Sequence, residues 1–250
     1  MKKYVGALFM LTLMLAGTAG AADELGLTGQ AAGKYQSRDY AGAAALYEKV
    51  IDAGRGSAAL FYDLGNAYFK TGQKAKALAS YRRAERLAPR DPDIRWNIGI
   101  LKDTLPDRID GGSGNIFIVK LNDLKQSYSP DEAAWALLGF LFALALGAAL
   151  KFASGAAQKF SSALVVIAVI GAAVSGLALG LKAADLREPA AVISLREVTA
   201  HYGPSDIETK AFVLHEGAEV RVSDETAQWY FIELADHKTG WVPKSACELV

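Results

Sequence analysis

Two uninterrupted apolar runs constrain this chain more than any other feature. Residues 133–150 and residues 163–181 contain no charged side chain. With a helical rise of about 1.5 Å per residue, each run matches the hydrocarbon core of a bilayer in length. The alternative is a pair of buried core helices, but no neighbouring soluble segment is large enough to surround two helices that are apolar on every side. The sequence therefore predicts transmembrane helices over 131–151 and 162–182.

The flanking charges predict how these helices are oriented. The connection between the runs carries Lys151 and Lys159 and no acidic residue. Because basic loops are retained in the cytoplasm, we expect the loop 152–161 to be cytoplasmic and both chain ends to lie outside. Residues 1–21 agree, since two lysines, a short apolar run and small residues form a secretory signal peptide, either cleaved or kept as an anchor. The expected location is a bacterial inner membrane, crossed twice, with both terminal domains periplasmic.

Local patterns predict how the two membrane helices begin and pack. Ser129-Pro130-Asp131-Glu132 has the pattern of a capping box with proline at the first helical position. Gly176 and Gly180 form a small-xxx-small pair that we expect to pack the two helices together.

Composition and motifs argue against several functions. Basic and acidic residues balance at 27 each, which argues against a nucleic-acid-binding protein that works by bulk charge. The single cysteine, Cys247, excludes an intrachain disulfide and a cysteine-built metal site. The sequence has no recognisable nucleophile or phosphate-binding motif. We therefore expect no catalytic residues, no cofactor and no metal.

A helical repeat precedes the apolar runs, at a period of about 34 residues. Small residues allow paired helices to approach closely, tyrosines fill the gap between them, and a proline ends the second helix. The residues that fit the spacing of a tetratricopeptide repeat are Phe61, Leu64, Gly65, Tyr68, Gly72, Ala77, Tyr81, Ala84 and Pro89. The segment one period before these residues matches the repeat pattern only in part. One period after them, the first helix of a further repeat begins. We expect about two repeats and a terminal helix over 22–105, then a linker over 106–130.

Repeats of this kind bind proteins on the face formed by the first helix of each pair. Here that face is expected to present Tyr62, Asn66, Phe69 and Asn97. The two asparagines stand where the carboxylate-clamp type of repeat has its amides, but Tyr62 replaces its lysine, which disfavours carboxylate capture. Alternatively, the amides satisfy local backbone groups. The next helix carries a basic group, which consists of Arg82, Arg83, Arg86 and Arg90. This group either faces an acidic partner or lipid headgroups, or it forms a solvent-exposed face of the helix.

Short alternating runs after the second apolar helix predict a small all-β unit over 189–250. Its motifs resemble bacterial SH3-like domains: Tyr202-Gly203-Pro204, Leu214 to Val220, Trp229-Tyr230 and Gly240-Trp241-Val242-Pro243. The resemblance implies a small β-barrel that binds peptides or cell-wall glycan-peptide through an aromatic cleft. Tyr202, Trp229 and Trp241 are the candidates for that cleft. Alternatively, the two tryptophans fill the core of a barrel too small to have much other filling.

The order of the parts carries a wider resemblance. A helical repeat, two membrane helices and an SH3-like unit, with the stretch from Leu87 to Arg95 followed by Asn97, resemble the BatE family of the bacterial aerotolerance operon. That resemblance implies work beside membrane proteins with von Willebrand A domains and a MoxR-type ATPase, and it implies no catalytic residues. We therefore expect a membrane-anchored adaptor for protein–protein interaction. The alternative is a peptidoglycan-binding sensor or tether that acts through the SH3-like unit.

Overall fold

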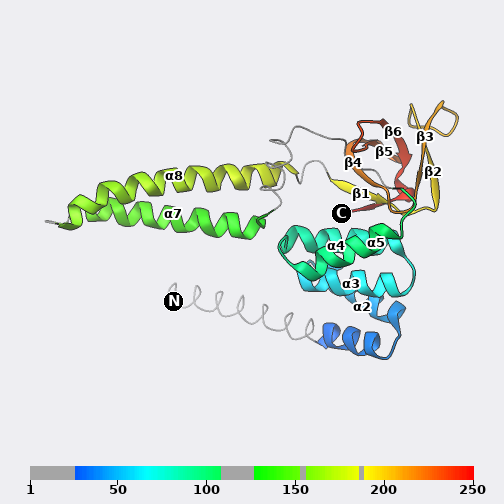
Figure 1. The fold of residues 1–250 in the computed structure, drawn as a ribbon, viewed down its shortest axis with the longest axis horizontal. Helices are drawn as coiled ribbons and strands as arrows, with labels where there is room; N and C mark the ends of the chain where they lie inside the picture. Colours follow the sequence, from blue (N-terminus) through cyan, green and yellow to red (C-terminus); the bar gives the residue numbers. More distant parts are fainter. Residues whose placement is uncertain (1–25, 108–126, 153–155, 186–188) are drawn as a thin grey trace, which may run out of the picture.

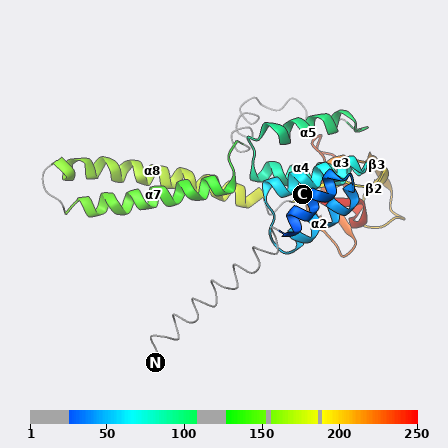
Figure 2. The same cartoon turned by 90° about the horizontal axis from the view of Figure 1, so that it is seen from below.

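The computed structural model of the protein describes residues 26–107, 127–152, 156–185 and 189–250. It contains a stack of helices, a long helical hairpin that projects from the stack, and an antiparallel sheet beside it (Figures 1 and 2). The predicted combination of a helical region, two apolar helices and an all-β unit is therefore confirmed. The predicted signal peptide, 1–21, and most of the predicted linker lie outside the described residues.

The helical stack contains a helix over 26–36 followed by α2 (Tyr40–Asp52), α3 (Ala58–Lys70), α4 (Lys74–Leu87) and α5 (Pro92–Asp103). Side chains that accept backbone hydrogen bonds begin three of them: Asp39 before α2, Ser57 before α3 and Asp91 before α5. The helices alternate along the chain as two antiparallel pairs and a final single helix, as the repeat spacing predicts.

The backbone itself repeats with the predicted period. Gly72, in the turn between α3 and α4, has a φ of 78°, and Arg38, 34 residues earlier, has a φ of 66°. This left-handed conformation suits glycine and is strained for arginine. The turn geometry is thus the same in both pairs, although the earlier turn lacks the residue that best fits it.

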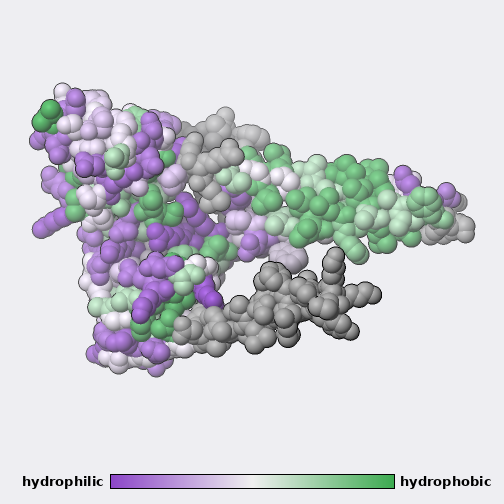
Figure 3. All heavy atoms as spheres, turned by 180° about the vertical axis from the view of Figure 1, so that it is seen from behind, coloured by the Kyte–Doolittle hydropathy of each residue, from purple (hydrophilic) through white to green (hydrophobic). Residues whose placement is uncertain are grey.

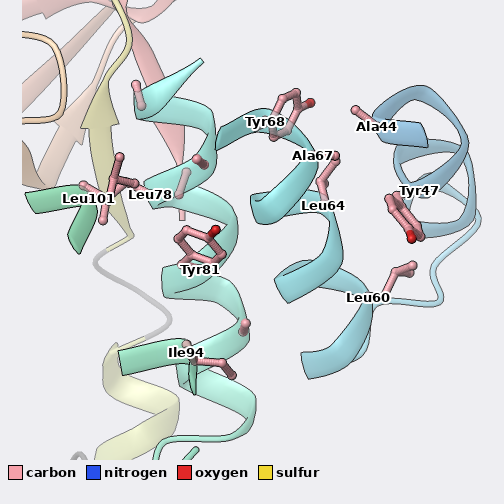
Figure 4. Packing of buried hydrophobic residues seen from close by; sticks show 14 of the residues in the cluster. Ala44, Tyr47, Leu60, Leu64, Ala67, Tyr68, Leu78, Tyr81, Ile94 and Leu101 are labelled. Atoms are coloured by element: carbon pink, nitrogen blue, oxygen red, sulfur yellow. The ribbon is translucent and has the colours of Figure 1, made fainter. Parts of the chain in front are cut away.

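The core of the stack lies between the helix pairs. Tyr81 points from α4 toward α3, and Ile94 and Leu101 point from α5 toward α4 (Figure 4). A Cβ atom at Gly65 would lie 2.6 Å from the Tyr81 ring, so α3 and α4 approach as closely as the sequence predicts. The second residue proposed for this close approach, Ala77, is fully buried.

The hairpin consists of α7 (Pro130–Leu150) and α8 (Ala156–Asp185). The predicted capping box is present, since the Ser129 hydroxyl accepts from the Glu132 N–H and the Glu132 carboxylate accepts from the Ser129 N–H. Within these helices, Pro130–Leu150 and Phe160–Ala184 are long and apolar enough to cross a membrane, with mean hydropathies of 2.2 and 2.6. Apolar side chains cover most of the hairpin face seen in Figure 3, which is compatible with a membrane protein.

The contact between α7 and α8 differs from the prediction. Gly176 and Gly180 have no atom within 4 Å of an added Cβ, so the expected packing at these glycines is wrong. A Cβ at Gly147 would instead meet Val165 at 2.8 Å, and a Cβ at Gly171 would meet the Phe140 ring at 2.3 Å. The close contact therefore uses one glycine from each helix, at positions where a large residue faces it from the other helix.

The last part is one sheet of β1 (Ala190–Ile193), β2 (Glu197–His201), β3 (Lys210–His215), β4 (Glu219–Glu225), β5 (Trp229–Glu233), β6 (Thr239–Pro243) and β7 (Cys247–Leu249), with a short 3₁₀ turn, η1 (Lys244–Ala246), before β7. The strand order is β3-β2-β6-β5-β4-β1-β7, and every pairing is antiparallel. Because β3 and β7 are unpaired edges, the sheet is not closed. The all-β prediction is confirmed, and the closed barrel is not.

Candidate protein-binding site

Three of the four residues predicted for the concave face of the helical repeat form one hydrogen-bonded cluster. Asn97 Nδ2 on α5 donates to Tyr62 Oη at 3.1 Å and to Asn66 Oδ1 at 3.0 Å, both on α3. Tyr81 Oη on α4 donates to the same Asn66 oxygen at 2.8 Å. The amides therefore bond to each other and to tyrosines rather than to the backbone. Phe69, the fourth residue, is half-buried and packs against the helical core.

Two exposed apolar residues on α5 extend this surface. Trp96 is 70 % exposed and Ile100 is 42 % exposed, and both lie on the same helix as Asn97. Neither belongs to the buried side of α5, which is Ile94, Ile98 and Leu101. The repeat spacing does not single them out, although the helical spacing of residues 92–103 assigns three other apolar residues to the core. Exposed apolar side chains of this size are typical of interaction sites.

Two of the three aromatic residues proposed for a cleft, Trp229 and Trp241, lie on the same face of the sheet, because Phe231 pairs with Trp241 and follows Trp229 by two residues. Tyr202, just after β2, is 68 % exposed, whereas Trp229 is only 8 % exposed and contacts the His201 ring edge-on. Trp241 is half-buried and lies opposite Phe231 on the next strand, with 5.1 Å between ring centroids. Trp229 is as buried as a core residue but does not belong to the buried cluster of the sheet, and Trp241 and Phe231 beside it are half-buried.

Three arginines of the basic group, Arg82, Arg83 and Arg86, lie on α4 and contact the sheet or the residue after it. Arg82 donates to both carboxylate oxygens of Glu219, at 2.7 and 2.9 Å, and Lys102 donates to Glu219 at 2.9 Å. Desolvation raises the pKa of Glu219, but the hydrogen bonds and charges of Arg82 and Lys102 together hold it below its ordinary value of 4.5. The solvated-face interpretation is therefore wrong for Arg82.

Further contacts join the helical stack to the sheet and to the start of the hairpin. Arg83 donates to the Leu249 carbonyl at 2.6 Å, and Arg86 donates to Val250 O at 2.7 Å. Val192 of β1 belongs to the buried cluster of the helices. Arg90, the last of the group, pairs with Glu132 at the start of α7. The outer side of α4 is thus an interface within the chain, and the concave side is left for other contacts.

The described residues include one cysteine, Cys247, whose thiol is not in a disulfide. Burial, followed by the charge of Glu248, raises the pKa of the Cys247 thiol to about 12, so this cysteine is a poor nucleophile at neutral pH. Among the parts of the chain that the structure describes, no group of three or more His, Cys, Asp or Glu side chains is arranged to hold a metal ion.

Comparison with known proteins supports the helical repeat. A family model described as a TPR repeat matches residues 65–102, which run from within α3 to near the end of α5. No curated protein matches the chain. The matched segment contains Asn66, Tyr81, Trp96 and Asn97, and Tyr62, the remaining residue of the cluster, lies just before it. Repeats of this kind support a role in protein–protein interaction.

Proposed function

We propose that the protein is a membrane-anchored, non-enzymatic adaptor that binds a partner protein on the concave side of its helical repeat. The observation that carries this proposal is the exposed Trp96, on the same helix as Asn97, which holds the cluster of Tyr62 and Asn66 in place. Tryptophan is prominent among the residues that dominate binding energy at protein interfaces. An ordered polar cluster beside it supplies groups that fix the orientation of a partner.

The two apolar helices are the anchor in this proposal, and the basic connection between them faces the cytoplasm. Two features support the membrane assignment. The outside of the hairpin is apolar, and the end nearest the folded parts carries the exposed Trp135 and the pair Lys182–Tyr128, with 5.1 Å from the ammonium to the ring centroid. Aromatic and basic residues are typical of a membrane–water interface. Both folded parts would then lie in the periplasm.

The order of the parts supports a finer proposal. A helical repeat, an apolar hairpin and a small all-β unit stand in the order of BatE-like proteins. The partners would then be membrane proteins with von Willebrand A domains, working with a MoxR-type ATPase system. A partner held at the membrane surface would be well placed to reach a repeat anchored there.

Co-purification of partners with the full chain from membranes tests the binding role. Trp96→Ala combined with Ile100→Ala removes exposed apolar surface from α5 without touching the buried residues of that helix. We expect this variant to lose bound partner at least tenfold. Ile207→Ala, at a residue 94 % exposed in the β-unit, is the matched control and should retain the partner. Equal loss in both variants, or no loss in either, would contradict the proposal.

A second candidate function rests on the sheet. The exposed Tyr202 and the Trp241–Phe231 pair, together with the resemblance of the β-unit to SH3-like domains, favour a peptidoglycan-binding tether. Co-sedimentation of the full chain with purified peptidoglycan tests it. Binding that Tyr202→Ala abolishes would support the tether, and an absence of co-sedimentation would exclude it.

A further inference from the structure

The helical stack contacts the start of the apolar hairpin at the turn between α4 and α5. Arg90, in this turn, forms an ion pair with Glu132, in the first turn of α7. Both side chains stay exposed in the pair, the arginine by 68 % and the glutamate by 43 %. Figure 1 shows the hairpin projecting from the stack. The ion pair therefore sets the level of the α4–α5 turn relative to the first residues of the hairpin.

The first residues of α7 are also where the apolar span begins. The stretch that is long and apolar enough to cross a membrane starts at Pro130, in the same helical turn as Glu132. Trp135, one turn further along α7, is 74 % exposed, and tryptophan is typical of the membrane–water interface. With the hairpin as the membrane anchor, Glu132 lies at the level of the lipid headgroups, and Arg90 lies there with it.

The groups near this turn are those that bind a phospholipid headgroup. Arg95, exposed on α5, donates from Nη2 to the Arg90 carbonyl at 3.4 Å, so two exposed arginines lie next to each other. Guanidinium groups form bidentate hydrogen bonds with phosphate. Asp93 and Asp131, exposed in the first turns of α5 and α7, add carboxylates that attract an ammonium group. Charges of both signs fit a zwitterionic headgroup, which has a phosphate and an amine, better than a purely anionic one.

An exposed apolar side chain lies close to these charges in the chain. Leu87, the last residue of α4, is 39 % exposed and precedes the turn that holds Arg90. Segments that lie in the interfacial layer of a bilayer combine basic residues with apolar side chains that enter the boundary between headgroups and acyl chains. The end of the stack that contacts the hairpin has both kinds of group.

We propose that the segment from Leu87 to Arg95 rests on the headgroups of the bilayer that holds the hairpin, with Arg90 and Arg95 binding phosphate. The inference rests on the membrane anchor of the proposed function. It also sets the height of the concave side. At a helical rise of about 1.5 Å per residue, Trp96 lies no more than about 6 Å farther from the headgroups than Pro92, where α5 begins. A partner bound at Trp96 is then one that reaches the membrane surface.

Photo-crosslinking to lipid tests this contact with the full chain in nanodiscs of phosphatidylcholine that contain phosphatidylethanolamine with a fluorescent acyl chain. A photoreactive phenylalanine replaces Leu87 in one variant and Val213, which is 47 % exposed in β3, in the matched control. We expect at least tenfold more fluorescent adduct from position 87 than from position 213. Arg90→Gln combined with Arg95→Gln should reduce the adduct from position 87 at least threefold. Lys70→Gln, at an exposed residue that ends α3 at the other end of the stack, should leave it unchanged.

Equal adduct from positions 87 and 213, no adduct from position 87, or an unchanged adduct in the double arginine variant would each overturn the inference. Failure of the membrane anchor is seen separately at Phe142, which is 73 % exposed in α7 and should give lipid adduct when it carries the same photoreactive group. Adduct from position 142 without adduct from position 87 would leave the anchor standing and remove the headgroup contact. No adduct from position 142 would contradict the anchor itself.

Discussion

The two sides of the helical repeat satisfy their polar groups differently. On the outer side, Arg82 and Lys102 are paired with Glu219 of the sheet, and Arg83 and Arg86 donate to carbonyl oxygens near the end of the last strand. On the concave side, Asn66 and Asn97 bond within the repeat, and Asp63 has no partner among the described residues. The polar groups on the outer side of the repeat are therefore paired with residues of the sheet, whereas those on the concave side are not paired with any other part of the chain that the structure describes.

This difference teaches how a short repeat is made stable while staying available for binding. Two helix pairs and a terminal helix are close to the smallest number that buries a continuous core. The sheet covers α4 and contributes Val192 to the helical core, so it does the work of a capping repeat. Because the cap binds the outer side, the concave side does not have to be covered for stability.

The largest expected effect is at the ionic contact of the outer side. Arg82→Met leaves Glu219 with a single cation, and we expect the opening free energy of β1, measured by amide hydrogen exchange, to fall by about 3 kcal/mol. Lys238→Met, at an exposed pair with Asp236, is the control and should change the same value by about 0.5 kcal/mol or less. Equal effects at the two sites would show that the sheet is not held by Arg82.

The same contact predicts a pH dependence. The pKa of Glu219 is below its ordinary value of 4.5 in the folded protein, so its contribution is present above pH 4.5 and is lost as the pH falls through the depressed value. Protection of β1 amides should therefore decrease below pH 4.5 in the wild type. Glu219→Gln should be weaker at neutral pH and should lose this part of the pH dependence.

A smaller effect is expected at the close approach of α3 and α4. Gly65→Ala places a Cβ against the Tyr81 ring and should lower the free energy of unfolding of the repeat by about 2 kcal/mol, measured by urea denaturation. Gly33→Ala, in the helix over 26–36, meets nothing within 4 Å and should stabilise by about 0.5 kcal/mol. Stabilisation by both substitutions would contradict the packing of Tyr81 on Gly65.

The next prediction compares the loss of unfolding free energy at two tyrosines one period apart. Tyr81→Phe removes the hydrogen bond to Asn66 and should cost about 1 kcal/mol of unfolding free energy. Tyr47 is equally buried but its hydroxyl forms no hydrogen bond with a described residue, so Tyr47→Phe should be nearly neutral. Equal costs would mean that the polar cluster of the concave side is not specific to the second pair.

The smallest effect is at Asp63. Its raised pKa means that the charged form is disfavoured in the folded protein, so stability is greater at low pH and falls as the pH rises through 3.8 and the raised value. Asp63→Asn should therefore stabilise by about 0.5 kcal/mol at pH 7, after allowance for solvent screening, and should have no effect at pH 3. Destabilisation at pH 7 would indicate a counterion on this carboxylate.

The elements of the fold follow from local patterns, and their contacts do not. The periodic residues around Gly65 and Tyr81 predict the helix pairs, and the motif beginning at Ser129 predicts the start of α7. The pairing of Arg82 with Glu219 joins residues 137 apart in the chain, and no local spacing encodes it. The same holds for Gly147 and Gly171, because the contact of two uniformly apolar helices depends on their rotation.

The candidate site could be predicted only in part, because the contacts between its helices are not encoded by local spacing. The positions of Tyr62, Asn66 and Asn97 follow from the repeat, but their mutual hydrogen bonds depend on how α5 packs against α3. Trp96 lies one period after Tyr62 and Ile100 one period after Asn66, but the repeat pattern alone does not say whether apolar side chains at these positions are covered. For Trp229 the sequence leaves a cleft residue and a core residue as alternatives, and the side chain is buried beside His201.

Site-specific photo-crosslinking in cells tests the central claim, that a partner occupies the concave side, most directly. A photoreactive phenylalanine replaces Trp96 in one variant and Ile207 in the other, since both residues are exposed and they lie in different parts of the molecule. We predict a discrete crosslinked partner from position 96 and none from position 207. A partner crosslinked only from position 207, or none from position 96, would contradict the account.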